Sequence, residues 1–284
     1  MGFFWHVLFV IANWFPSILG FNLIFGRGKM LHFGPVGTSL VAFYATAIVL
    51  KATGSYLFAF LACLVATELI SLFFAWFSLR LESDGLGIMT IAVHLFLLAV
   101  VLNWTTLTRG ALGIPGIQRH PFLLSQPRMA LTMVCVAVLW FFFMLWIDRG
   151  PLGRKLTALA EHPWHAEALG VNRARVQTAA FLVGGLGTSV VAFFWVQYLG
   201  LVHPNDLLFP VLILYVMNVV AGKPGSVAGV ALSTTLLVLL KEGLRFVPLT
   251  PDMIGPLRLI LFGLILFGAV WWRRDTVFPP ERKI

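Results

Sequence analysis

Long apolar blocks, separated by short polar stretches, run through most of the chain. A helix that crosses a membrane needs about 20 mostly apolar residues, and about nine blocks approach that length. The predicted spans are Phe3–Phe25, Phe33–Leu50, Ser55–Leu79, Leu86–Leu102, Arg128–Ile147, Val176–Leu199, Leu207–Val220, Ser226–Leu240 and Ile254–Trp272. This pattern predicts an all-α, polytopic membrane protein, with some short or broken spans, in which residues 1–284 form one transmembrane domain.

A polar central loop, over about residues 148–175, interrupts this pattern. Within it, apolar side chains recur at helical spacing and predict one apolar stripe. These side chains are Leu156, Leu159, Ala160, Trp164 and Ala168. Pro163 is tolerated in a first helical turn, and Gly170 suits a C-terminal cap. We predict a short amphipathic helix from about Glu161 to Leu169, which is either a plain connecting helix or a lever held in a groove of a soluble partner.

Composition supports the membrane class. Only 11% of the residues are charged and 60% are hydrophobic, whereas a soluble domain carries about 25% charged residues. The net charge is +9, but no basic run exceeds two residues, so the cations indicate membrane orientation and not nucleic-acid binding. Placing the central loop in the cytoplasm puts most Lys and Arg inside, which predicts the N-terminus outside and the C-terminus inside.

Polar and glycine-rich positions within the apolar blocks are candidates for a solute pathway. Glu68 lies midway along the third predicted span, where a carboxylate costs about 2.5–3.5 kcal/mol and should face the protein interior or a wet cavity. It is either a substrate or gating contact or a hydrogen-bonded structural residue. Two segments rich in glycine, Gly26–Gly37 and Gly222–Gly229, interrupt the early and late spans. They either line a cavity or pack closely, or they are ordinary turns.

The sequence offers little for catalysis. His162, His165 and Glu167 stand close together, but the spacing of the two histidines, with Pro163 between them, does not match a metal-binding helix, so no metal site is expected. No phosphate-binding loop of the GxxxxGK[ST] type is present in the sequence, so the chain is not expected to bind ATP in that way.

Four segments together resemble a known family. AEALGVN (Ala166–Asn172) resembles the cytoplasmic coupling loop of ABC-transporter permeases of the branched-chain amino acid class, which includes urea and amide relatives. The segments Asn22–Gly34, Leu102–Ile117 and Val219–Leu237 resemble family segments in the same order. The chain departs from the family pattern at several positions. These are Lys29, His32, Thr157, Ala160, Lys223 and Pro224.

The resemblance implies a non-catalytic permease subunit of an importer in a bacterial inner membrane. Its expected partners are ABC ATPase subunits that bind the ATP, a sister permease, an extracytoplasmic solute-binding protein and membrane lipid, with no cofactor in this chain. The expected cargo is a branched-chain amino acid or a related small polar solute. The expected ATPase contacts are Glu161, Ala166, Glu167 and Gly170. The candidate pathway residues are Glu68, Gly225 and Ser226. The alternative is a transporter or channel that works without an ATPase.

Overall fold

The computed structural model describes residues 2–246 and, beyond them, residues 257, 260, 261, 263–265, 267, 268 and 271. Eight helical segments in this part of the chain are long and apolar enough to cross a membrane. They are α1 (Gly2–Phe21) with the π-helix η1 (Asn22–Arg27), α2 (Pro35–Thr53), α3 (Tyr56–Ser78), α4 (Ser83–Asn103), α6 (Gln126–Arg149), α9 (Arg173–Leu199), η4 (Pro204–Leu207) with α10 (Pro210–Ala221), and α11 (Val227–Gly243) with η5 (Leu244–Phe246). The predicted all-α, polytopic class is confirmed. The ninth predicted span, Ile254–Trp272, lies largely outside the described residues.

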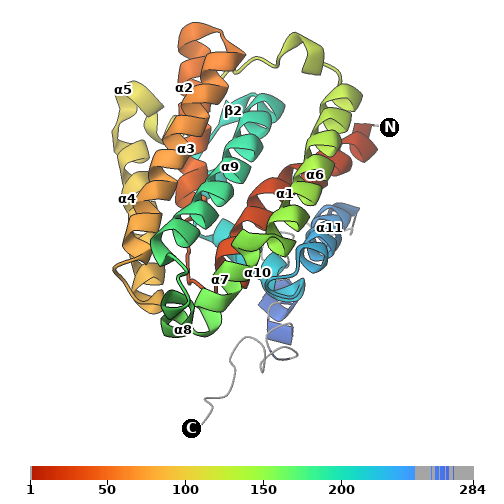
Figure 1. Cartoon of the computed structure of the whole chain (residues 1–284). Coiled ribbons are helices and arrows are strands. Elements are labelled where there is room, and N and C mark those ends of the chain that lie inside the picture. The colour runs from red at the N-terminus through yellow and green to blue at the C-terminus, as the bar shows by residue number, and fades with distance from the viewer. Residues whose placement is uncertain are drawn as a thin grey trace.

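Shorter elements connect the spans (Figure 1). The connection from α4 to α6 contains α5 (Thr105–Thr108), η2 (Gly110–Leu112), β1 (Ile114–Pro115) and η3 (Pro121–Leu123). Strand β1 pairs antiparallel with β2 (Leu201–Val202), with Ile114 opposite Val202, and so ties this connection to the end of α9. At the other end of the bundle, α7 (Pro151–Glu161) and α8 (Pro163–Ala168) connect α6 to α9.

Local capping sets the ends of several spans. The side chains of Ser55, Asn172 and Ser226 each accept a hydrogen bond from a backbone N–H in the first turn of α3, α9 and α11. Such caps satisfy backbone donors that a helix leaves unpaired at its start. Gly54 and Gly200 end α2 and α9 with positive φ angles, a conformation that favours glycine.

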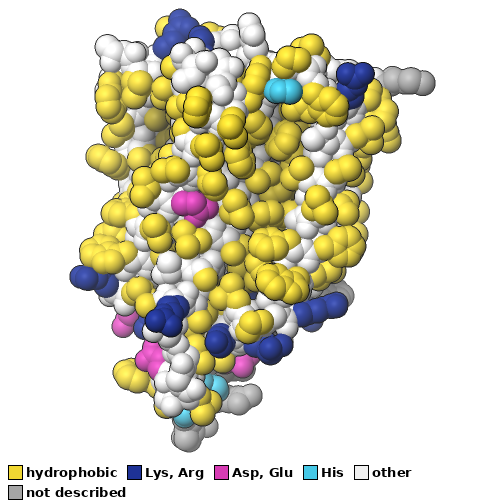
Figure 2. Space-filling view, turned by 45° about the horizontal axis from the view of Figure 1, so that its top comes forward, with side chains coloured by type: hydrophobic (Ala, Val, Ile, Leu, Met, Phe, Trp, Pro, Cys, Tyr) yellow, Lys and Arg dark blue, Asp and Glu magenta, His cyan; other side chains and the backbone are white. Residues whose placement is uncertain are grey.

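The core lies along α1, α2 and α9. Helix α9 packs against α1, α2 and α3, and it passes through the middle of the bundle (Figure 1). The outer helices α3, α4 and α6 turn apolar side chains outward, as a lipid-facing surface requires, and Figure 2 shows a broad apolar band on one side of the molecule.

Small residues allow α1 and α9 to approach closely. A Cβ atom placed on Gly20 would lie 2.9 Å from the Cα atom of Gly184, so the two backbones are nearly in contact. Helices in membranes associate largely through such tight packing, because lipid is as apolar as the helix surfaces.

Gly20→Ala is expected to lower the melting temperature of the detergent-solubilised protein by several degrees. Alanine favours helix by about 1 kcal/mol over glycine, but the clash with Gly184 should cost about 1–3 kcal/mol. Gly85→Ala in α4 is the matched control, because its nearest neighbour would lie at 3.7 Å. That variant should melt at the wild-type temperature or slightly above it. Equal melting temperatures for the two variants would contradict the close approach of α1 and α9.

Candidate functional site

The central loop folds as two helices where the sequence predicted one. Helix α7 ends at Glu161, and α8 begins at Pro163. The chain changes direction at His162, where φ is −144° and ψ is 80°. The prediction of a single helix from Glu161 to Leu169 is therefore wrong at its start. The reason is steric, because the proline ring disfavours helical backbone at the residue before it.

This break divides the predicted apolar stripe. Leu156 and Leu159 of α7 are buried in the core. Trp164 in α8 is 84% exposed and Leu169, directly after α8, is 86% exposed, so the members of the predicted stripe do not share one environment. Figure 1 places α8 at the extreme end of the bundle. Large apolar side chains exposed at an aqueous end are typical of protein-binding surfaces.

The four residues expected to contact an ATPase do not share one environment. Glu161, Glu167 and Gly170 are exposed. Ala166 is only 4% exposed and packs into the core. Its placement does not fit direct contact with a partner, and it instead holds α8 against the bundle. The sequence did not indicate Trp164 and Leu169 as exposed, because the break at His162 sets the direction of α8.

A glycine closes α8. The N–H of Gly170 donates to the carbonyl of Glu167 at 2.9 Å, and the N–H of Val171 donates to the carbonyl of Ala166 at 3.0 Å. These two bonds form a Schellman motif, in which the residue after the cap adopts a left-handed conformation. Gly170 has a φ of 84°, so glycine is suited to this position, as the sequence predicted.

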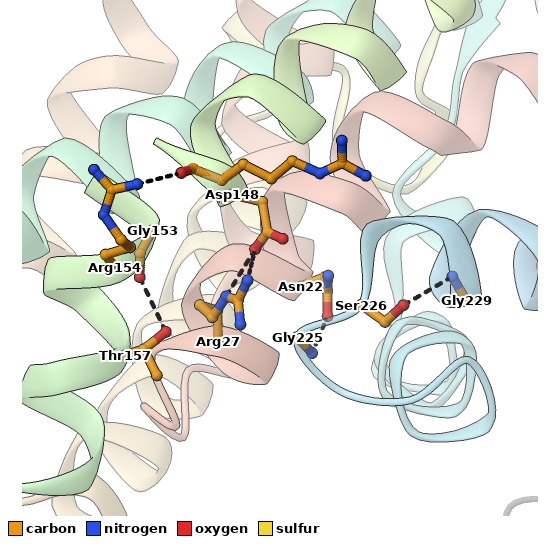
Figure 3. Close-up of polar contacts among 10 residues, drawn as sticks. Asn22, Arg27, Asp148, Gly153, Arg154, Thr157, Gly225, Ser226 and Gly229 are labelled. Atoms are coloured by element: carbon orange, nitrogen blue, oxygen red, sulfur yellow. Dashed lines mark hydrogen bonds and ion pairs between the residues drawn. The ribbon is translucent and has the colours of Figure 1, made fainter. Parts of the chain in front are cut away.

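An ion pair connects the end of α6, just before α7, to the first span. Arg27, the last residue of η1, donates from Nε to Oδ1 of Asp148 at 2.7 Å, and its Nη2 lies 2.5 Å from the same oxygen. Asp148 lies near the end of α6, just before α7 begins. Figure 3 shows this pair beside Gly153 and Thr157 of α7. The two side chains are only 29% and 15% exposed, so their attraction is screened less than that of a surface pair.

The two glycine-rich segments meet, which was not predicted from the sequence. The N–H of Gly225 donates to Oδ1 of Asn22 at 2.9 Å (Figure 3). A Cβ atom on Gly26 would collide with both Asn22 Oδ1 and the Gly225 nitrogen. The segments therefore pack closely, one of the possibilities left open by the sequence. Ser226 caps α11 through the N–H of Gly229 at 3.1 Å.

His32, at which the chain departs from the family pattern, packs against two aromatic rings. Its ring packs edge-on against Phe74 and Phe181, with centroids 5.0 and 4.9 Å apart. The residue lies between the first two spans and is 3% exposed. Burial lowers the pKa of His32 to about 3, so the imidazole is neutral at physiological pH.

Glu68 belongs to α3, and its side chain lies against α9. Both carboxylate oxygens are buried, and neither has a hydrogen-bond partner within the described part of the chain. A Cβ atom on Gly185 of α9 would lie 3.1 Å from Oε1 of Glu68. The carboxylate thus points into the protein, as its cost in lipid requires. Its contacts are with α9, whereas Gly225 and Ser226 lie at the turn between α10 and α11, so these three candidates do not form one cluster of contacts.

The described residues contain no group of three or more His, Cys, Asp or Glu side chains that could hold a metal ion. His162 and His165 pack edge to face, with ring centroids 5.4 Å apart.

Comparison with known proteins identifies a family that matches most of the chain. A family model described as "Branched-chain amino acid transport system / permease component" matches residues 7–270. The high-affinity branched-chain amino acid permease LivM of Salmonella typhimurium is 26% identical over 295 residues, which cover 93% of this chain and 67% of the relative. LivM of Escherichia coli K12 matches with the same identity and coverage.

The autoinducer 2 import permease LsrD of Klebsiella pneumoniae is 29% identical over 188 residues, covering 62% of this chain and 56% of the relative. The match thus spans little more than half of that relative's length. No solved structure matches the chain. Because the family model covers nearly the whole chain, this membrane protein belongs to the permease family of branched-chain amino acid transport systems.

Proposed function

We propose that the chain is the non-catalytic membrane subunit of an ATP-driven importer for branched-chain amino acids or a related small polar solute. Partner ATPase subunits bind and hydrolyse the ATP and dock on α8. A sister permease completes the pathway, and an extracytoplasmic binding protein delivers the solute. The observation that carries this proposal is the exposure of Trp164 and Leu169 at the tip of a family permease.

The contacts around α7 and α8 would transmit the movement of the ATPases. Helix α7 packs against η1 and α9. Asp148, near the end of α6 and just before α7, is paired with Arg27, and η1 is in turn bonded to Gly225 through Asn22. A displacement of α8 would therefore reach the first span, α9 and the α10–α11 turn together. Alternating access requires such rigid-body movement of groups of helices.

The distribution of charge supports a cytoplasmic position for α8 in a bacterial inner membrane. Cationic side chains gather toward the end of the bundle that holds α8, as Figure 2 shows. In the described part of the chain they are Arg27, Lys29, Arg80, Arg149, Arg154, Lys155, Arg173, Arg175 and Lys223. Cytoplasmic loops carry such an excess. This orientation places the N-terminus outside.

Gly170→Asp is expected to reduce ATP-dependent uptake at least tenfold in proteoliposomes that hold the permeases, the ATPases and the binding protein. The aspartate adds a charge and a side chain at the proposed docking surface, at a residue whose φ is positive. Gly116→Asp is the matched control, because Gly116 also has a positive φ and open space around it, but it lies in the connection after α5. Full uptake by Gly170→Asp would favour the alternative, a transporter or channel that needs no ATPase.

A further inference from the structure

A cavity of about 190 Å³ lies at the α8 end of the bundle. Its wall is formed by the η1–α2 connection, the turn between α3 and α4, the segment α7–α8 and the start of α9. Three residues in this wall, Lys29, Glu82 and Ser83, are exposed, so the cavity opens to solvent. Its volume has room for several water molecules, and therefore for a small polar group.

Arg173, the first residue of α9, brings an incompletely paired guanidinium to this wall. Its Nη2 donates to the backbone carbonyl of Ser78 at 3.3 Å, and its Nε is buried without a hydrogen-bond partner in the described part of the chain. In Arg27 the same edge of the guanidinium, Nε with Nη2, holds a carboxylate oxygen of Asp148. Arg173 forms no such ion pair with a described residue. Because buried donors are nearly always paired, this edge is suited to an oxyanion that enters from outside.

Lys29 supplies a second positive charge to the cavity. Its φ is 51°, a conformation that favours glycine, and the chain departs from the family pattern at this position. Ser83 fixes the segment, because its Oγ accepts from the N–H of Leu31 at 2.9 Å and donates to the carbonyl of Lys29 at 3.4 Å. Residues held in such rare backbone conformations cluster at functional sites. Here the conformation places an ammonium group at the open side of the cavity.

The wall as a whole favours an anion. Among the described residues that line the cavity, Glu82 is the only carboxylate, and it stands against the two cations Lys29 and Arg173. The long helices α4 and α9 both begin at the cavity, and the start of a helix carries a partial positive charge. A guanidinium edge binds phosphate oxygens in pairs, and an ammonium group binds them as a point charge. The combination therefore fits a phosphate group.

We propose that this cavity binds a phosphate group, which belongs either to a small soluble phosphate compound or to the headgroup of an anionic lipid. Nε and Nη2 of Arg173 donate to two of its oxygens, and Lys29 neutralises the remaining charge. The bound group lies beside Ala160 of α7 and Pro163 of α8, so it connects the break between these helices to α9 and to the η1–α2 connection. This site needs neither an ATPase nor the transported solute, and it goes beyond the proposed function.

The test uses the full chain, freed of lipid in a maltoside detergent without phosphate, and radiolabelled inorganic phosphate at constant ionic strength. Wild type should bind phosphate saturably. Arg173→Lys keeps the charge but removes the two-donor edge, so it should weaken binding about tenfold or more. Arg175→Lys is the matched control, because Arg175 lies on the same helix but is exposed and does not line the cavity. It should bind phosphate as wild type does.

Two further variants test the charges at the open side of the cavity. Lys29→Gln should weaken phosphate binding about fivefold, as expected for an exposed ionic contact. Glu82→Gln should strengthen it by a similar factor, because it removes a negative charge from the wall. Both side chains are exposed, so these variants still test the site if Arg173→Lys does not fold. Elution volumes and melting temperatures without phosphate establish which variants are folded.

A second arm distinguishes the two sources of the phosphate group. The chain is taken from nanodiscs that contain phosphatidylglycerol and examined by native mass spectrometry. Retention of one phosphatidylglycerol by wild type and by Arg175→Lys, but not by Arg173→Lys, identifies a lipid headgroup. Saturable phosphate binding without retained lipid identifies a soluble phosphate compound. The site is refuted if wild type binds neither probe, or if Arg173→Lys and Arg175→Lys bind both probes equally.

Discussion

Trp164→Ala is expected to weaken capture of the ATPase subunits by about 30-fold and to abolish ATP-dependent uptake. Trp164 is 84% exposed at the tip of α8, so its truncation removes little packing within this chain. A buried tryptophan at the centre of an interface commonly contributes about 2 kcal/mol or more, which corresponds to about 30-fold in affinity. The measurement is binding of the purified ATPase to the permease in nanodiscs, by surface plasmon resonance.

Trp146→Ala provides the control for this variant. Trp146 is 71% exposed, but it lies on the outer face of α6, within a predicted span. Its truncation should leave ATPase affinity unchanged. If both tryptophan variants bind the ATPase as wild type does, α8 is not the docking surface, and the exposed pair of Trp164 and Leu169 needs another partner.

The second large effect is expected from the ion pair between Arg27 and Asp148. Exchange of one charge, in Arg27→Asp or in Asp148→Arg, places like charges together and should reduce uptake at least tenfold. Exposed pairs contribute at most about 1 kcal/mol, and breaking fully buried pairs costs about 3–5 kcal/mol. Because this pair is mostly buried, we expect each single variant to lose about 2 kcal/mol of the interaction free energy between the two side chains.

The double variant with both exchanges should recover most of the uptake, because the attraction is restored in the opposite direction. ATP hydrolysis measured in the same vesicles separates coupling from folding. Single variants that still hydrolyse ATP but move no solute are uncoupled, whereas loss of both activities indicates misassembly. Arg245→Ala, which breaks the ion pair with Glu242 at 3.1 Å near the opposite end of the bundle, should transport normally. Failure of the double variant to recover would show that the pair does not transmit movement.

Much of the fold could be predicted from hydrophobic periodicity alone. The apolar blocks located every span that the described residues contain, because a membrane helix needs a continuous apolar length that few other structures need.

The prolines were harder to interpret from the sequence. Pro16 lies within α1 without ending it, whereas Pro163 separates two helices. The difference lies in the surroundings, because α1 is packed between α6, α9 and α11, whereas α8 lies at the end of the bundle.

The candidate site was only partly predictable. The capping role of Gly170 could be assigned from the sequence, because a C-terminal cap depends on residues that are adjacent in the chain. The pairs Arg27–Asp148 and Asn22–Gly225 could not, since their members lie 121 and 203 residues apart and no local spacing links them. Glu68 was placed in the interior on energetic grounds, and the structure agrees. Its possible role in a pathway remains a prediction.

The bond between Asn22 and Gly225 also has a consequence for the synthesis of this protein. Ribosomes deliver η1 early, but its partner follows 203 residues later. Until Gly225 has been made, the N–H that Asn22 accepts in the finished structure is absent. The close packing of Gly26 against Gly225 is therefore one of the last contacts that the growing chain can form, although one of its members is made near the beginning.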